Sequence, residues 1–356
     1  MIQASSVSRR SASFTQSMTD SLLAGVCRAL AADADSPPSA SDDIYPFPQR
    51  LLARGSVPLD SLLGPRCAAD LLALVQRAGA VLLRGFAPAG DVGFDRVLRS
   101  LPAEPFTYEE SFSNAVRRAR TDRVFTANEA PADVEIFLHH EMAQTPLAPR
   151  YLAFYAEQVA DSGGATPLCQ SDRLLSQLQR LVPDFVSQCR QVGVCYTHTM
   201  PAVPDKESGQ GRSWRDTLSV DGKQQAQVRL ETLGYRYQWL SGDELQVTTP
   251  ALAGIRQLPD GREVFFNQLV AAFAGWRDRR NPGTHAVCFG DGSEMSDNAL
   301  DAVVAAAYGQ VYEHSWEAGD VVLLDNLQVM HGRRPFTGHR AVLAGLAAPM
   351  ELAAQL

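Results

Sequence analysis

The chain has 356 residues, of which 45% are hydrophobic and 20% charged, which is the composition of an ordinary globular protein. No apolar run approaches the roughly 18 residues that a membrane-spanning helix needs, so an integral membrane protein is excluded. The formal net charge of −8 argues against general nucleic-acid binding, which needs a basic surface. Six cysteines without a C-x-x-C pair are typical of reduced thiols in a cytoplasmic protein.

Residues 1–43 are expected to form a flexible N-terminal tail. The serine-rich start lacks the apolar stretch of a secretory signal. Thr19 and Asp20 can cap a short amphipathic helix over residues 20–32, and the polar, proline-containing stretch 33–43 predicts a linker. The folded domain is therefore expected to span residues 44–356.

From residue 44 onward the chain alternates short strand-like runs with a few helices. The apolar spacing after Pro65 predicts a helix, and helices are also expected at 172–181 and 298–308. Strands are expected at 80–86, 121–126, 134–141, 151–158, 191–198, 234–240, 263–267, 311–316, 320–324 and 340–347. Many short strands with Gly and Pro turns predict a β-sandwich or barrel, and no glycine-rich phosphate loop supports a nucleotide-binding fold.

One short segment carries the first candidate metal ligands. Side chains alternate between the two faces of a strand, so His139 and Glu141 point to one side and His140 to the other. A second histidine would complete the 2-His-1-carboxylate triad of a non-haem iron(II) oxygenase. A lone H-x-E tripeptide arises by chance in many proteins. The H-x-E tripeptide becomes stronger evidence for a metal site together with His331, which follows the apolar strand expected at 320–324.

Further short motifs occur in a fixed order between about residue 80 and residue 347. They are Leu83-Arg-Gly-Phe86, Thr126-Ala-Asn-Glu-Ala130, Leu138-His-His-Glu-Met142, Gly163-Gly-Ala-Thr-Pro167, Phe265-Phe-Asn-Gln268, Gly319-Asp320 with Asp325-Asn326, and His331-Gly-Arg333. With them the sequence resembles the TauD/TfdA-like (taurine dioxygenase-like) family of iron(II)/2-oxoglutarate oxygenases, most closely its SyrP-like branch. The resemblance implies a mainly β fold with α-helices: a double-stranded β-helix, or jelly-roll core, with flanking helices.

The resemblance assigns the iron ligands to His139, Glu141 and His331. It implies iron(II), 2-oxoglutarate and dioxygen as the cofactor set. Halogenating relatives replace the metal carboxylate with a small residue, whereas Glu141 keeps the carboxylate here. Hydroxylation is therefore expected in place of halogenation.

Two further residues match the family's positions for binding 2-oxoglutarate. Thr166 matches the threonine of the G-G-x-T motif, and Arg340 matches the arginine that pairs with the distal carboxylate. A guanidinium fork suits a carboxylate, and a hydroxyl adds one hydrogen bond. Arg333 and Arg334 are the alternatives to Arg340 for this role.

The SyrP-like branch hydroxylates amino acids during nonribosomal peptide assembly. We therefore expect an amino acid or amino-acid-derived substrate in natural-product (antibiotic) biosynthesis, either free or tethered to an acidic carrier protein. A desaturase or cyclase of a free amino acid or small acid is one alternative, and an inactive jelly-roll binding module is another. Candidate substrate residues are Asn128, Glu129 and Asn267, for which a role in a turn is the alternative.

Two arginine clusters stand out against the negative net charge. They consist of Arg117, Arg118, Arg120 and Arg123, and of Arg277, Arg279 and Arg280. Such a cluster is usually a solvated face. An acidic carrier would be repelled by the chain as a whole, so it would need a local positive patch, and these clusters are the densest candidates.

Overall fold

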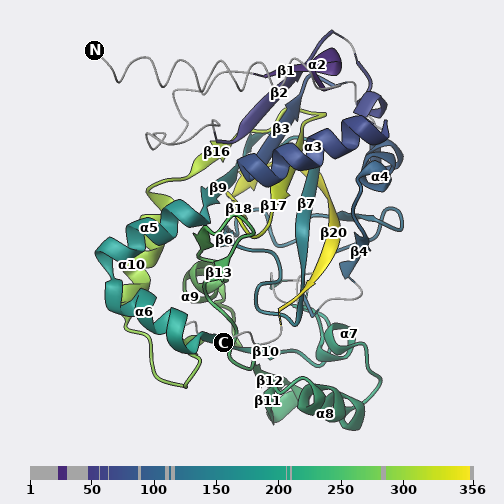
Figure 1. Cartoon of the computed structure of the whole chain (residues 1–356). Helices are drawn as coiled ribbons and strands as arrows, with labels where there is room; N and C mark the ends of the chain where they lie inside the picture. Colours follow the sequence, from purple (N-terminus) through teal and green to yellow (C-terminus); the bar gives the residue numbers. More distant parts are fainter. Residues whose placement is uncertain are drawn as a thin grey trace, which may run out of the picture.

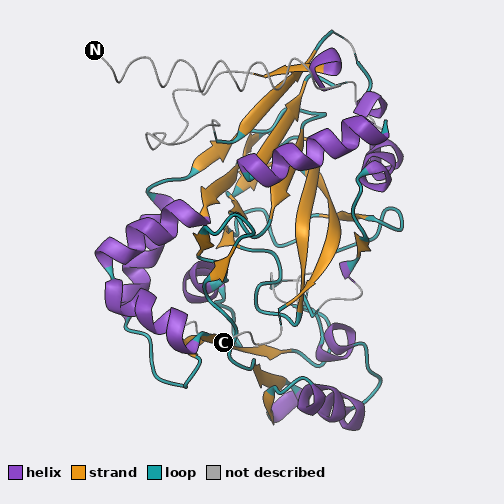
Figure 2. Cartoon of the chain, in the orientation of Figure 1, coloured by secondary structure: helices purple, strands orange, loops and turns teal. Residues whose placement is uncertain are grey.

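Two β-sheets that face each other form the core, and helices cover their outer sides (Figures 1 and 2). The computed structural model describes residues 23–29, 47–55, 57–62, 64–86, 90–108, 112–113, 117–205, 207–208, 211–281 and 286–352. Facing sheets with flanking helices confirm the predicted mainly β jelly-roll fold. None of the described helices combines the length and the apolar character needed to cross a membrane.

The larger sheet has eight strands in the order β1-β2-β3-β17-β7-β20-β4, and β5 pairs with β20. These strands are β1 (Cys27–Ala29), β2 (Gln49–Ala53), β3 (Ala80–Arg84), β4 (Pro105–Phe106), β5 (Val124–Thr126), β7 (Leu147–Gln158), β17 (Val321–Asp325) and β20 (Ala341–Glu351). Neighbours are antiparallel except β2 and β3, which are parallel.

The smaller sheet has the order β16-β9-β18-β6. Its strands are β6 (Ile136–His139), β9 (Thr166–Gln170), β16 (Tyr312–His314) and β18 (Val329–Arg333). In the antiparallel pair of β18 and β6, His331 lies directly opposite His139. The register of this pair therefore brings together two histidines that are far apart in the sequence.

The central strands of the larger sheet are buried on both faces. On β17, Val322 and Leu324 face the core between the sheets, whereas Val321 and Leu323 pack with α3 (Pro65–Ala78) and α4 (Gly90–Ser100). Figure 1 shows α3 lying across this sheet. Burial on both faces explains why the strand is a continuous apolar run in the sequence.

A long insertion between β9 and β16 covers the smaller sheet. Its helices α5 (Ser171–Leu181), α6 (Pro183–Val192), α9 (Leu269–Gly275) and α10 (Asp297–Tyr308) share one hydrophobic cluster with that sheet. A second group has its own small core, made by α7 (Trp214–Leu218), α8 (Lys223–Thr232) and the sheet β11-β12-β10-β15. The strands of that sheet are β10 (Val194–Met200), β11 (Arg236–Trp239), β12 (Leu245–Thr248) and β15 (Val287–Phe289).

Short two-stranded pairs and single turns complete the fold. They are β8 (Ser162–Gly163) with β19 (Phe336–Thr337), β13 (Arg256–Gln257) with β14 (Glu263–Val264), and the 3-10 turns η1 (Leu59–Leu62) and η3 (Ser241–Asp243).

The helix predicted over residues 20–32 was wrong in its second half. Of the described residues in this segment, 23–29, α2 (Leu23–Val26) is helical, and β1 follows it and pairs with β2. Cys27 is fully buried there, because pairing with the open edge of β2 outweighs the helical preference of the segment. The linker predicted at 33–43 lies outside the described residues.

Several predicted strands end earlier than expected, and two of these ends lie next to candidate site residues. The strand predicted over 134–141 stops at His139, and Met142 has a left-handed φ of 57° in the turn that follows. The strand predicted over 263–267 stops at Val264. The helices predicted after Pro65, at 172–181 and at 298–308 are confirmed as α3, α5 and α10.

Candidate active site

The three candidate metal ligands meet at one edge of the smaller sheet. His139 ends β6, His331 lies opposite it on β18, and Glu141 follows in the turn after β6. Their ligand atoms all lie within 4.8 Å of one another. Oε2 of Glu141 is 3.5 Å from Nε2 of His331 and 3.8 Å from Nε2 of His139. Two imidazoles and one carboxylate at this spacing can occupy one face of an iron(II) ion.

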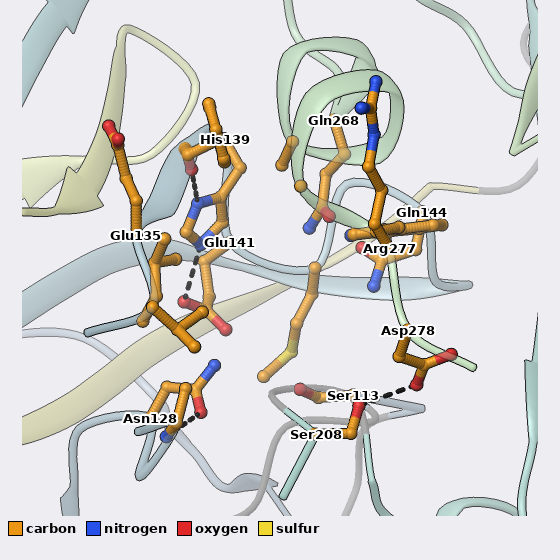
Figure 3. A pocket seen from close by; sticks show the side chains of 18 of the residues that line it. Ser113, Asn128, Glu135, His139, Glu141, Gln144, Ser208, Gln268, Arg277 and Asp278 are labelled. Carbon is orange, nitrogen blue, oxygen red and sulfur yellow. Dashed lines mark hydrogen bonds and ion pairs between the residues drawn. The ribbon is translucent and has the colours of Figure 1, made fainter. Parts of the chain in front are cut away.

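Both imidazoles are prepared for metal binding. Nδ1 of His139 lies 2.8 Å from the carbonyl oxygen of Phe137, so it can donate there and leave Nε2 as the metal-binding nitrogen. Figure 3 shows this ring above Glu141 in the cavity wall. Burial and the neighbouring His139 lower the pKa of His331 to about 4, which keeps that ring neutral near pH 7. The cluster therefore fits a divalent metal ion.

Glu141 is ionised because Arg117 lies against it. Nη2 of Arg117 is 3.1 Å from Oε1 and 3.3 Å from Oε2, and both side chains are buried. Burial raises the pKa of Glu141, but Arg117 and the two histidines outweigh it and hold the pKa well below its usual range. The sequence marked Arg117 only as one member of an arginine cluster.

Asn326 fixes the backbone of Glu141. Its Oδ1 accepts from the Glu141 N–H at 2.8 Å, and its Nδ2 donates to the Glu141 carbonyl at 3.0 Å and to the Pro149 carbonyl at 2.8 Å. His140 points away from the cluster, where its ring contacts the Asn326 carbonyl and lies 2.8 Å from the Ser171 hydroxyl. The predicted alternation of His139, His140 and Glu141 therefore holds even though the strand ends at His139.

An inner cavity borders the cluster on the side of the larger sheet. Its lining includes His139, His331, Phe154, Val342, Thr166 and Arg340. The Thr166 hydroxyl is buried and accepts a hydrogen bond from Trp316 Nε1 at 3.0 Å. Burial and repulsion from Arg333 lower the pKa of Arg340 to about 10, and no ion pair to this guanidinium occurs within the described residues.

The two alternative arginines are occupied elsewhere. The Arg333 guanidinium donates to four backbone carbonyls, at 2.6 to 3.3 Å, which belong to Asn128, Ala130, Pro131 and Val134. Arg334 forms ion pairs with Glu135 at 2.6 Å and with Glu313 at 2.5 Å. Of the three arginines, only Arg340 offers an uncommitted guanidinium to the inner cavity.

The G-G-x-T motif makes room for Arg340. Gly164 has a φ of +72°, and a Cβ at this position would lie 3.1 Å from Cδ and 3.2 Å from Nε of Arg340. A Cβ on Gly163 would lie 2.3 Å from the Pro335 carbonyl oxygen. Both glycines are needed because the backbone turns left-handed and passes close to the segment that carries the arginine.

An outer cavity lies on the other side of the cluster (Figure 3). In Figure 3, His139 and Glu141 form one wall and Gln144 and Gln268 lie across from them. Further lining residues are Ser113, Arg117, Asn128, Glu135, Met142, Ser208, Trp276, Arg277 and Asp278. The two cavities share Arg117, Asn128, Ile136 and His139.

The three candidate substrate residues lie in different surroundings. Asn128 lines both cavities, and its Oδ1 accepts from the Ala130 N–H at 3.0 Å. Glu129 lines neither cavity and pairs with Arg118 at 2.7 Å. Asn267 is buried, where it accepts from Leu269 N–H and donates to the Gly254 carbonyl. Only Asn128 is brought next to the metal cluster.

The prediction of a solvated face was wrong for one member of each arginine cluster, Arg117 and Arg280. Arg117 is buried against Glu141, and only 1% of the Arg280 side chain is exposed. Arg280 pairs with Asp205 at 2.8 Å and with Asp278 at 3.0 Å. Acidic neighbours compensate most of these charges, so neither cluster is a continuous positive surface.

This fold and donor set define a jelly-roll protein of the non-haem iron type. The family model for "Taurine catabolism dioxygenase TauD, TfdA family" matches residues 43–346, so the chain belongs to this family. The match confirms the predicted enzyme class, an iron(II)/2-oxoglutarate-dependent dioxygenase, together with its cofactors iron(II), 2-oxoglutarate and dioxygen.

Two relatives and two solved structures are similar to the chain. A clavaminate synthase-like protein of Arabidopsis thaliana is 35% identical, over 87% of this chain and 92% of the relative. The dapdiamide synthesis protein DdaC of Enterobacter agglomerans is 30% identical, over 78% of this chain and 84% of the relative.

The structure of AAD-2 with Mn(II) and N-oxalylglycine has a TM-score of 0.56 at 12% identity and covers 92% of this chain and 100% of that chain. PvcB, an Fe, α-ketoglutarate-dependent oxygenase from an isonitrile synthetic pathway, has a TM-score of 0.51 at 15% identity and covers 92% and 97%. The two structures share the fold.

Proposed function

We propose that this enzyme hydroxylates an amino acid or an amino-acid-derived compound in natural-product biosynthesis. In this proposal His139, Glu141 and His331 hold the iron. Thr166 and Arg340 bind 2-oxoglutarate. The observation that carries the proposal is the inner cavity, where two of the three clustered ligands, His139 and His331, border the same space as the uncommitted Arg340 guanidinium.

In this proposal, residues of the chain bind and orient 2-oxoglutarate and keep water out of the cavity. When bound, iron(II) supplies with 2-oxoglutarate and dioxygen the oxidation of a substrate C–H bond, with succinate and carbon dioxide as co-products. Arg340 would pair with the distal carboxylate of 2-oxoglutarate, and Thr166 would add one hydrogen bond. The apolar Phe154 and Val342 would keep water from this end of the cavity.

The substrate class rests on the relatives. DdaC is a dapdiamide synthesis protein, and PvcB, similar in fold, is from an isonitrile synthetic pathway. Both names support a role in biosynthesis from amino-acid-like compounds. Desaturation or cyclisation of a free amino acid or small acid is the alternative. An inactive jelly-roll module is disfavoured, because an idle scaffold need not keep the cluster and Arg340 together.

A substrate tethered to an acidic carrier protein remains part of the proposal, although the arginine clusters give it little support. A cytoplasmic location is proposed from the cysteines, because all six lie in described segments and none of them forms a disulfide.

The test is metal analysis of the purified protein and succinate release with iron(II) and 2-oxoglutarate. A screen by mass spectrometry would then compare free amino acids with the same amino acids on a carrier protein. We expect one iron per chain and a product 16 Da heavier than its substrate. A product lighter by two hydrogens would favour the desaturase or cyclase. Absence of both iron and succinate would leave the inactive module.

A further inference from the structure

The outer cavity contains buried polar atoms that have no protein partner. Among the described residues, Nε of Arg117 and Oε1 of Gln144 are buried without a hydrogen bond, and both residues line this cavity. A buried polar group without a partner costs free energy, so such groups in a cavity indicate a ligand that satisfies them.

Arg117 has donors to spare beside the iron ligands. Its side chain is 8% exposed, and its guanidinium carbon lies 4.1 Å above the centre of the Tyr108 ring. The contacts to Glu141 use one terminal nitrogen, Nη2. A guanidinium has five N–H donors in a planar fork, which matches a carboxylate better than it matches any neutral group. A bound metal ion would share the negative charge of Glu141. Arg117 would then be a buried cation whose positive charge is not fully compensated.

Gln144 offers an acceptor across the cavity from the metal ligands (Figure 3). It is 7% exposed and lies two residues after Met142, whose left-handed backbone turns the chain at this wall. The neighbouring Gln268 differs, because its Nε2 already donates to the His140 carbonyl at 2.9 Å. Gln144 is therefore the lining amide whose buried oxygen lacks a hydrogen bond.

Three acidic side chains besides Glu141 line the cavity, of which Glu207 is exposed and the other two are engaged elsewhere. Glu135 pairs with Arg334 at 2.6 Å, and Asp278 pairs with Arg280 at 3.0 Å. A buried cation and a neutral amide acceptor are thus what the wall beside the cluster offers. This combination fits a carboxylate together with an N–H donor, as in an α-amino acid or its N-acyl derivative.

We propose that the outer cavity holds a substrate by a free carboxylate at Arg117 and by an N–H group at Gln144. This inference rests on the proposed function and narrows it. A substrate tethered through its only carboxyl group would lose the anchor at Arg117. A carrier-bound substrate would therefore need a second, free carboxylate.

The test measures binding separately from turnover. Isothermal titration without oxygen gives the affinities for Mn(II) and then for 2-oxoglutarate. The probes for the outer cavity are the twenty standard L-amino acids, their α-carboxamides and their deamino analogues, titrated into the complex with Mn(II) and 2-oxoglutarate. The variants are Arg117→Gln, Arg117→Lys and Gln144→Leu. The control is Arg279→Gln, whose side chain is 72% exposed.

We expect at least one acid to bind roughly 30-fold or more tightly than its carboxamide, because a buried charge pair is lost in the amide. Arg117→Gln should abolish this preference, Arg117→Lys should restore part of it, and Arg279→Gln should not change it. Affinities for Mn(II) and 2-oxoglutarate should change by less than about threefold, a small effect beside the loss of a buried pair. In Gln144→Leu, the preference for the acid over its deamino analogue should fall.

Two results would overturn the inference. In the first, no acid binds, or acids and carboxamides bind equally well to the wild type. In the second, Arg117→Gln weakens Mn(II) binding while the preference for acids persists, which would make Arg117 only a positioning residue for Glu141. Failure of the wild type to bind Mn(II) and 2-oxoglutarate would instead contradict the proposed function itself.

Discussion

The inner and outer cavities share His139 and Arg117 but are built from different kinds of structure. The inner cavity is walled mainly by β6, β7, β9, β18 and the start of β20, so strand register fixes most of its side chains. The outer cavity is walled largely by turns and by α9, with Gln144 and Asp278 on irregular segments. Strands hold a constant geometry, whereas loops vary among relatives and carry specificity. The inner cavity is thus suited to the shared chemistry, and the outer cavity to the substrate.

The arginines of the two cavities show the same contrast. Arg340 directly precedes β20 of the larger sheet and has no ion pair in the described structure, whereas Arg117 is held by an ion pair with Glu141. An uncommitted cation can bind a dianionic co-substrate in every catalytic cycle. Arg117 instead pairs with the candidate metal ligand Glu141 and also lines the outer cavity.

The largest expected effect is the loss of a metal ligand. Each of His139→Ala, Glu141→Ala and His331→Ala should remove iron binding and lower succinate release by more than the roughly 100-fold typical for a group that only orients a ligand. Iron content and succinate release measure the effect, and thermal unfolding of the metal-free proteins checks the fold. The control is His339→Ala, because His339 is exposed outside the cluster. Full activity in any of the three ligand variants would remove that residue from the metal site.

A smaller effect is expected at the far end of the inner cavity. Arg340→Ala should raise the KM for 2-oxoglutarate by roughly 30-fold or more, since loss of a buried charge partner costs about 2–5 kcal/mol. Iron binding should be unchanged, which would separate this end of the cavity from the cluster. Arg334→Ala is the matched control, because its guanidinium is already paired with Glu135 and Glu313. A larger effect in the control would transfer the co-substrate role to Arg334.

A buried histidine behind the outer cavity should make the fold sensitive to acid. His198 packs against Trp276, and neither of its ring nitrogens has a hydrogen bond within the described residues. Burial lowers the pKa of His198 to about 4. The unfolded chain takes up a proton near pH 6.5 and the folded chain does not, so stability falls as the pH drops from 6.5 toward 4.

Between pH 7.5 and pH 5 this single group should lower the free energy of unfolding by about 2 kcal/mol. Urea unfolding of the wild type and of His198→Phe at both pH values measures the difference. We expect the variant to lose less stability on acidification than the wild type. Equal losses of stability in the two proteins would mean that the pKa of His198 is the same in the folded and in the unfolded chain.

The strands that could be predicted from the sequence are those with a plain apolar pattern. β3 and β17 are continuous apolar runs because both faces are buried. β18 was missed because His331, Gly332 and Arg333 interrupt the pattern, although all five of its residues are buried. α8 was missed because only Ala226 and Leu230 are buried, which leaves no apolar stripe to detect.

The residues of the candidate site also differ in how well the sequence predicts them. Short motifs marked the candidate metal ligands, Thr166 and Arg340, because strand positions and a glycine turn leave a fixed spacing in the sequence. Arg117 and Gln144 have no such spacing. Their place beside the cluster depends on how turns pack after the strands have formed, and a single sequence does not contain that information.

The smallest expected effect tests whether the glycine turn of the inner cavity serves Arg340. Gly164 and Gly292 both have a left-handed backbone, with φ of +72° and +86°, so alanine at either position should cost about 1 kcal/mol of stability. The two sites differ in space: a Cβ on Gly164 would press on Arg340, whereas a Cβ on Gly292 would have nothing within 4 Å. Gly164→Ala should therefore also raise the KM for 2-oxoglutarate several-fold, and Gly292→Ala should leave it unchanged. Urea unfolding measures the loss of stability that the two variants share, and the KM for 2-oxoglutarate measures the effect of the contact with Arg340. If both variants lose the same stability and neither changes the KM for 2-oxoglutarate, the glycine turn serves only the backbone. The position of the Arg340 guanidinium then does not depend on it.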